Sequence, residues 1–241
     1  MSRTQYIQNY NRIIKRNEKL YIPRVQAELR RQVQVYIDTQ DLGAINSQGM
    51  VKVVTNLSYT AGVAWARYSN AYIKNQKKAA GQMGFNERIV QLMQAYYGAD
   101  FLNVCENITN TTKDQIARVL EQAAQEGWGI DKITQTLKSP ELTAFRAKLI
   151  SRTETIAAAN SAAVLNVKDL GYDFKKEWIA ALDSRTRKDH RELDGKRVGL
   201  YEAFKVDMVG KGVQQLLQPG DKSLGADAGQ LCNCRCCVAF E

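Results

Sequence analysis

Apolar side chains recur at helical spacing through most of the first 170 residues. The first such segment contains Ile7, Tyr10, Ile14, Leu20 and Tyr21. After Pro23 the same spacing continues at Val25, Leu29, Val33 and Tyr36. Residues 24–139 contain no proline, so long helices are predicted, and Pro23 is expected to kink or divide the first of them.

Short runs of glycine and polar residues separate further predicted helices. The segment GAINSQG precedes a helix over about 51–79, and two glycines separate it from a helix over about 85–97. Thr112 and Gln115 have the spacing of a capping box, which predicts a helix from there to Glu126. The sequence GWG that follows is expected to end it.

The sequence Ser139-Pro140-Glu141 has the features of a helix start: a capping hydroxyl, a proline at the first helical position and an acid in the first turn. This helix is expected to run to about Asp169, where Gly171 stops it.

From residue 172 onward, short apolar runs and turn pairs replace the helical spacing. Asp194-Gly195, between Leu193 and Val198, is typical of a tight β-hairpin turn. We therefore predict a mostly α protein with extended N-terminal helices and a small α+β C-terminal module. The expected domains are a basic helical region, 1–139, and the α+β module, 140–241.

Composition supports a soluble, folded protein: of 241 residues, 24% are charged and 44% hydrophobic. No stretch approaches the roughly 18 consecutive apolar residues of a membrane span, and the N-terminus lacks the apolar middle of a signal peptide. Four of the five cysteines crowd at Cys232, Cys234, Cys236 and Cys237. This crowding, in a chain expected in a reducing cytosol, indicates metal or local redox chemistry rather than a disulfide framework.

A string of spaced motifs fills the C-terminal part of the chain. RTETIAAANSA at 152–162 is followed by KEWIAALDSRTRKDHRELDGKRV at 176–198, then Phe204, a Pro-Gly-Asp turn at 219–221 and NCRC at 233–236. In this order the motifs resemble the Mu F-like minor head proteins of tailed phages, also called phage head morphogenesis proteins. The resemblance covers roughly residues 144–238.

The resemblance implies a virion protein, made in the host cytoplasm and present in few copies at the portal vertex. Its expected role is head morphogenesis, with a further role in genome packaging or ejection, and its expected partners are the portal protein, the major capsid protein or both. No membrane contact and no enzyme activity are expected.

His190 is the one histidine of the chain, and it lies in the same module as the four crowded thiols. Zinc prefers tetrahedral sets of nitrogen and sulfur ligands, so we predict a structural zinc site of His190, Cys234 and Cys236, with Cys232 or Asp183 as the fourth ligand. On a strand Cys232 would share the face of these two thiols, and Cys237 would point away. The alternative is that the cysteines are small buried apolar residues.

The long helix from residue 140 is expected to bond outward to the β module. Arg152 is expected to pair with Asp183 or Asp194, and Glu154 with backbone donors or Arg185. Asn160 is expected to tie the helix to a loop.

A metal-dependent enzyme acting on nucleic acid, with His190 and Asp183 in its site, is the alternative function. The segment DHRELDG is faintly similar to zinc-dependent nucleases, but such sites need more than one histidine. A triad of Ser184, His190 and Asp194 is disfavoured because no G-x-S-x-G elbow surrounds the serine.

Residues 1–36 contain eight basic and two acidic side chains, which form a large part of the net charge of +9. Helical spacing makes most of the interleaved tyrosines packing residues. Two interpretations of the charge stay open: a solvated helix face, or contact with an acidic portal surface or non-specifically with DNA phosphates.

Overall fold

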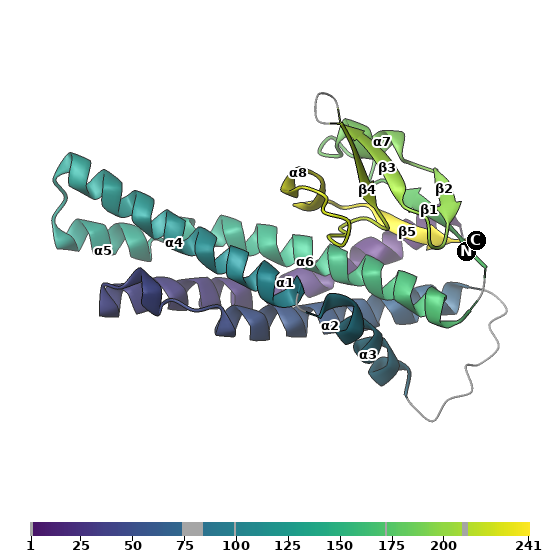
Figure 1. Cartoon of the computed structure of the whole chain (residues 1–241), viewed down its shortest axis with the longest axis horizontal. Helices are drawn as coiled ribbons and strands as arrows, with labels where there is room; N and C mark the ends of the chain where they lie inside the picture. The colour runs from purple at the N-terminus through teal and green to yellow at the C-terminus, as the bar shows by residue number, and fades with distance from the viewer. Residues whose placement is uncertain (1, 74–83, 99, 172, 209–211) are drawn as a thin grey trace. The chain divides into compact units, whose positions relative to one another are not determined.

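The computed structural model describes residues 2–73, 84–98, 100–171, 173–208 and 212–241 (Figure 1). Helices dominate the first 170 residues, and short strands and helices follow. The long helices are α1 (Arg3–Thr39), α2 (Gln48–Tyr72), α3 (Phe85–Tyr97), α4 (Asp100–Glu126), α5 (Ile130–Lys138) and α6 (Pro140–Asp169). A short 3-10 helix, η1 (Leu42–Ala44), precedes α2. The predicted fold class, mostly α with a small α+β C-terminal part, is confirmed.

The C-terminal strands form two small antiparallel sheets. One sheet has the order β2-β1-β5, from β1 (Lys175–Ile179), β2 (Arg197–Gly199) and β5 (Cys237–Phe240). The other is the pair of β3 (Phe204–Met208) and β4 (Gly212–Leu216). Two one-turn helices, α7 (Lys188–Glu192) and α8 (Ala228–Leu231), lie in the connections. The last strand therefore pairs with the first, and the connections between them carry the remaining elements.

The chain forms two compact units, each assembled from separated segments. Unit 1 comprises residues 1–18, 57–96 and 152–241, and unit 2 comprises 19–56 and 97–151. The expected boundary after residue 139 coincides with the start of α6, whereas each unit combines segments from both sides of it. The division into domains 1–139 and 140–241 stays a prediction.

The core of unit 2 is the apolar face that the sequence pattern predicts. Val25, Leu29, Val33 and Tyr36 are all buried. They pack with residues of α2, α4 and α6, including Met50, Val54, Cys105, Ile116 and Ala147. Their spacing of three and four residues places them on one side of α1. Burial of this apolar side stabilises the helix, although its opposite side is basic and exposed.

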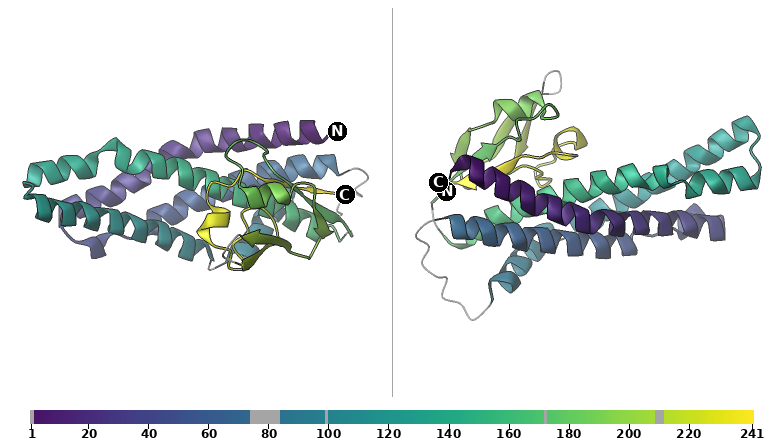
Figure 2. Two further views of the ribbon diagram at one scale, coloured as in Figure 1. Left: turned by 90° about the horizontal axis from the view of Figure 1, so that it is seen from above. Right: turned by 180° about the vertical axis from the view of Figure 1, so that it is seen from behind.

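The core of unit 1 has two clusters, and both contain residues of the β2-β1-β5 sheet. The first joins the start of α1 to α6 and β5 and contains Tyr6, Tyr10, Trp65, Ile156, Ala163 and Val238. The second fills the C-terminal module and contains Trp178, Leu193, Phe204, Leu216, Cys234 and Cys236. Figures 1 and 2 show the strands gathered beside the second half of α6, with the start of α1 next to β5.

Two local expectations are wrong, and a third, at Pro23, is wrong in one of its two forms, the division of the first helix. Pro23 does not divide the first helix, because Tyr21 and Val25 on either side are buried and their packing outweighs the backbone bond that proline lacks. Thr112 lies inside α4 and not at its start, since its hydroxyl donates to the Ile108 carbonyl. The Asp194-Gly195 turn joins α7 to β2 and not one strand to another.

Other boundaries agree with the sequence pattern. Helix α4 ends at the predicted glycines, α6 begins at Pro140 with Ser139 accepting from the Glu141 amide, and Gly171 has the left-handed φ of a helix stop. Helix α2 ends at Tyr72, and the end that we expected near residue 79 lies outside the described residues. Among the helices described, none is long and apolar enough to cross a membrane.

Candidate functional site

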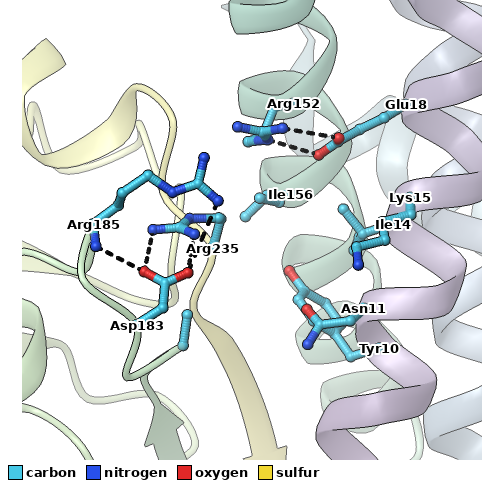
Figure 3. Close-up of a pocket in the computed structure, with 11 residues that line it drawn as sticks. Tyr10, Asn11, Ile14, Lys15, Glu18, Arg152, Ile156, Asp183, Arg185 and Arg235 are labelled. Atoms are coloured by element: carbon cyan, nitrogen blue, oxygen red, sulfur yellow. Dashed lines mark hydrogen bonds and ion pairs between the residues drawn. The ribbon is translucent and has the colours of Figure 1, made fainter.

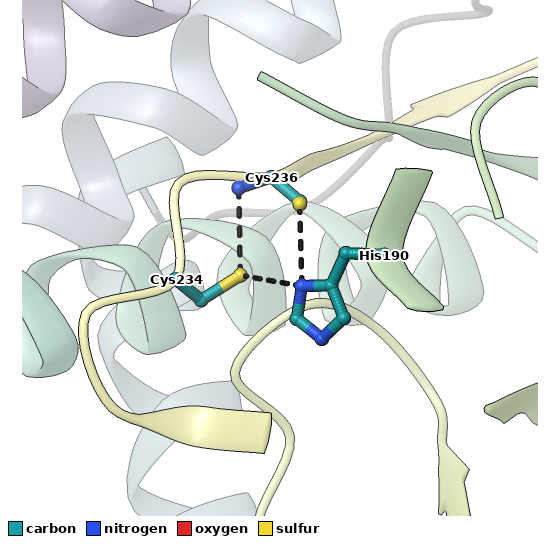
Figure 4. A group of neighbouring side chains, drawn as sticks. All are labelled: His190, Cys234 and Cys236. Atoms are coloured by element: carbon teal, nitrogen blue, oxygen red, sulfur yellow. Dashed lines mark hydrogen bonds between the residues drawn. The ribbon is translucent and has the colours of Figure 1, made fainter. Parts of the chain in front are cut away.

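Three predicted ligand residues meet inside the C-terminal module. His190 lies on α7, and Cys234 and Cys236 lie in the loop between α8 and β5 (Figure 4). The Nδ1 atom of His190 is 3.6 Å from each of the two sulfur atoms. The Cys236 amide donates to the Cys234 sulfur at 3.4 Å. The structure thus brings together the histidine and the two cysteines of the NCRC motif.

A chain of two hydrogen bonds fixes the orientation of the His190 ring. Its Nε2 is 2.6 Å from the Gln230 Oε1. Gln230 in turn donates from Nε2 to the Asp189 carboxylate at 2.5 Å, so its amide oxygen must face the histidine. Nε2 of His190 therefore carries the proton, and Nδ1 faces the two sulfurs. Neither Gln230 nor Asp189 was identified from the sequence, although Asp189 is the immediate neighbour of His190.

The cluster is enclosed by apolar and aromatic side chains. His190, Cys234 and Cys236 are each exposed by 2% or less, and the Trp178 ring meets His190 edge-on at 5.2 Å. Burial acts to lower the pKa of His190, but the hydrogen bond and charge of Cys234 outweigh it and leave that pKa above its usual value.

The pKa values of the two thiols shift in opposite directions. The hydrogen bond with Cys236 holds the pKa of the Cys234 thiol well below its usual range, while the same bond, with burial, raises the pKa of Cys236 well above it. Two sulfur atoms and an imidazole nitrogen are ligands that soft cations prefer.

The other two proposed ligands lie elsewhere. Asp183 forms a two-bond ion pair with Arg235, with Nη2 2.6 Å from Oδ1, and also accepts from the Arg185 amide. Cys232 is half-buried, and its carbonyl accepts from Arg187. Among the described residues, neither belongs to the group of ligand atoms that lie within 4.8 Å of one another. Residues 232–236 form no strand, so the side-chain alternation of a strand does not apply, and with it the expectation that Cys232 faces the same side as the other two cysteines. Cys237 begins β5 and packs in the cluster of unit 1 that contains Tyr6 and Trp65.

The outward bonds of α6 differ from those expected. Arg152 pairs with Glu18 of α1 and donates to Asn233, and not to Asp183 or Asp194. Glu154 pairs with Lys222, with Nζ–Oε2 2.7 Å, and not with Arg185. The two acids that we expected to pair with Arg152 pair with other arginines: Asp183 with Arg235, and Asp194 with Arg3.

Asn160 ties α6 to loops of the β module, as predicted. Its amide nitrogen donates to the carbonyls of Pro219 and Cys236, at 3.1 and 3.2 Å. Its oxygen accepts from the Val238 amide at 3.1 Å. One fully buried side chain thus holds both the proline turn and the entry into β5.

A buried lysine, not identified from the sequence, links the two sheets. Lys176 of β1 donates to the carbonyls of Glu202 and Leu217, at 2.7 and 2.8 Å. These residues lie just before β3 and just after β4. Burial lowers the pKa of Lys176 to about 8. Its ammonium group is therefore charged at neutral pH and satisfied by backbone oxygens.

A cavity of about 200 Å³ lies between α1 and the β module of unit 1 (Figure 3). Cationic side chains outnumber carboxylates in its lining: Lys15, Arg152, Arg185 and Arg235 face Glu18 and Asp183. Arg152 and Arg235 are paired with these acids. Lys15 and the largely exposed Arg185 leave the cavity with a net positive lining.

Comparison with known proteins identifies relatives that match about half of the chain. Minor head protein GP7 of Bacillus phage SPP1 is 33% identical over 130 residues, which are 53% of this chain and 40% of that protein. The NAD(+)--arginine ADP-ribosyltransferase EFV of Enterococcus faecalis (strain ATCC 700802 / V583) is 31% identical over 115 residues, 46% of this chain and 22% of that enzyme. These matches span less than half the length of either relative. No solved structure matches the chain.

The family described as "Phage Mu protein F like protein" matches residues 114–239, more than half of the chain. That range contains the second half of α4, all of α6, the two sheets, His190 and the NCRC motif. It also includes the residues from which the resemblance was inferred. The chain therefore belongs to the phage Mu protein F-like family.

Proposed function

We propose that this chain is a minor head protein that acts in phage head morphogenesis. The similarity to the SPP1 minor head protein over 53% of this chain carries the proposal, and membership of the Mu F-like family supports it. Interaction with other head proteins follows from that role. The specific partners that we propose are the portal protein, the major capsid protein or both, with the chain located in the virion.

The burial of the candidate site supports a structural role over an enzymatic one. His190, Cys234 and Cys236 are exposed by 2% or less, so a substrate has no access to them. Asp183, the acid of the nucleic-acid-processing alternative, is paired with Arg235 instead of lying beside His190. ADP-ribosyl transfer is not proposed either, since the shared segment is only 22% of that enzyme.

The head-protein role predicts that the chain copurifies with both procapsids and virions in low copy number. Mass spectrometry of density-purified particles checks this, with the major capsid protein as the internal standard. Host proteins of similar abundance serve as the control for adhesion to the particles. Absence of the chain from both particles would contradict the proposed role.

Contact with DNA phosphates is the finer part of the proposal, and the exposed face of α1 supports it. All eight basic residues between 1 and 36 are exposed, whereas the four tyrosines of the same segment are buried. In unit 1, Arg12, Lys15 and Arg16 form no ion pair with any described residue, and Lys15 also lines the cationic cavity. Because the tyrosines are buried, the cationic side chains are the groups of this segment that can reach a phosphate. Binding should therefore depend on charge and not on base sequence.

The triple variant Arg12→Gln, Lys15→Gln, Arg16→Gln is expected to weaken duplex binding and to reduce the slope of log K against log salt by about 3. Fluorescence anisotropy over a range of salt concentrations measures this. The matched control removes three exposed charges from other helices, Arg118→Gln, Lys138→Gln and Lys148→Gln, and should leave the slope unchanged. Wild-type binding that ignores salt or selects one sequence would refute phosphate contact.

A further inference from the structure

We propose that His190, Cys234 and Cys236 bind one zinc ion, which fastens the loop before β5 to α7. The ligand atoms are Nδ1 of the histidine and the two Sγ atoms, which lie within 4.8 Å of one another. They come from elements more than 40 residues apart in the sequence, and each is directed inward (Figure 4).

The distances fit a tetrahedral ion. With Zn–S and Zn–N bonds of about 2.3 and 2.0 Å, tetrahedral angles separate nitrogen from sulfur by about 3.5 Å. Both of the observed nitrogen–sulfur distances are 3.6 Å. A zinc ion therefore needs only small movements of the three side chains to reach all three atoms.

The second layer of contacts prepares the histidine as a ligand. Gln230 accepts from Nε2, and Asp189 holds Gln230 in the orientation that makes this possible. Metal-bound histidines almost always donate their other ring N–H to such a group, which directs the lone pair at the ion. The Asp227 carboxylate caps α8 at the Gln230 amide and so positions this residue from its backbone as well.

The backbone of the NCRC loop explains how a C-x-C pair can bind one ion. In an extended strand the two side chains would stand too far apart, but residues 233–236 form no strand, and Asn233, just before the pair, has a left-handed φ of 58° that bends the chain there. Thr153 of α6 accepts from the Asn233 amide and holds this bend. The Cys236 amide then points at the Cys234 sulfur, where it stabilises a thiolate.

The described residues supply three ligand atoms that lie within 4.8 Å of one another. Cys232 and Asp183, the expected candidates for a fourth ligand, lie outside this group: Cys232 is half-buried and Asp183 is paired with Arg235. Cys232 therefore provides a matched control: it is a cysteine of the same loop that should not bind the ion.

The test measures metal in the full chain purified in reducing buffer without added metal or a metal-affinity step. Elemental analysis should give about one zinc per chain for the wild type and for Cys232→Ser and Cys105→Ser. His190→Ala, Cys234→Ser and Cys236→Ser should each lose the ion. Gln230→Ala should retain it but weaken affinity by about 10- to 100-fold in a chelator competition.

A spectroscopic measurement on the wild type avoids the question of whether a variant folds. Protein stripped with a chelator and titrated with cobalt(II) should develop thiolate charge-transfer bands and d–d bands of tetrahedral intensity, complete at one equivalent per chain. Wild-type protein that carries no metal and gives no such bands would overturn the proposal and leave a buried thiol–imidazole cluster. Loss of zinc in Cys232→Ser would overturn the ligand assignment.

Discussion

Asn160→Ala is expected to lower the free energy of unfolding of unit 1 by about 4 kcal/mol. The substitution leaves two buried backbone groups without this partner, the carbonyl of Pro219 and the amide of Val238, and it removes one of the two hydrogen bonds to the Cys236 carbonyl, which Tyr10 still bonds. Each such group costs about 1 to 3 kcal/mol when it loses its hydrogen bond inside a protein. Urea unfolding measures the loss, and amide exchange at Val238 should accelerate with it.

Asn166→Ala is the matched control, because it changes the same residue type on the same helix. Asn166 is also buried, but it bonds the side chains of Asn70 and Arg88, which can turn toward water when it is removed. A loss of about 1 kcal/mol is expected there. Equal losses at the two positions would show that the backbone bonds of Asn160 are not what makes it important.

Gly220→Ala is expected to destabilise the same unit by about 3 kcal/mol, because two effects add. Gly220 has a φ of 84°, where a side chain is strained. An added Cβ would also lie 2.9 Å from the Cα of Ala157 and 3.1 Å from its nitrogen, so it would meet the backbone of α6. A helix backbone cannot give way as the end of a flexible side chain can. The midpoint of urea unfolding measures the effect.

Gly225→Ala separates the two effects. Gly225 has a similar φ of 75°, but nothing lies within 4 Å of its added Cβ. Only the conformational strain of about 1 kcal/mol remains. If both alanine variants lose the same stability, the close approach of the Pro219-Gly220 turn to α6 contributes nothing.

Much of the helical part could be predicted from the sequence, because its information is local. The stripe through Val25, Leu29 and Val33 specifies a buried helix face, and Ser139-Pro140 specifies a helix start. Where two local signals compete, the sequence alone did not determine whether a helix continues, ends or begins. Pro23 gives a helix-breaking signal that packing overrides, and α5 (Ile130–Lys138) was not foreseen so soon after the GWG segment.

The convergence of His190, Cys234 and Cys236 could be predicted from the sequence, but their surroundings could not, and the expected fourth ligands, Cys232 and Asp183, lie outside the group. Histidine and cysteine carry a chemical signature, so His190, Cys234 and Cys236 could be grouped without knowledge of the fold, and zinc binding stays a prediction. Gln230 carries no such signature, and its role depends on a turn of helix that starts at Asp227. The partner of Arg152 could not be predicted from the sequence either. Arg152 bonds Glu18, 134 residues away, whereas Asp183 and Asp194 were the expected partners.

The contact between the start of α1 and the last strand affects the order in which the protein can fold during synthesis. Tyr6 and Tyr10 donate their hydroxyls to the carbonyls of Val238 and Cys236, and β5 is one of the two neighbours of β1. The segments of unit 2 are all translated by residue 151, so that unit can form while the ribosome is still at work. Unit 1 has to wait until residues 237–240 emerge, and its first helix keeps an unsatisfied apolar face until then. A nascent chain stalled after residue 151 and before those residues therefore combines a complete unit 2 with an incomplete unit 1, whose apolar surface is open to chaperones and to aggregation.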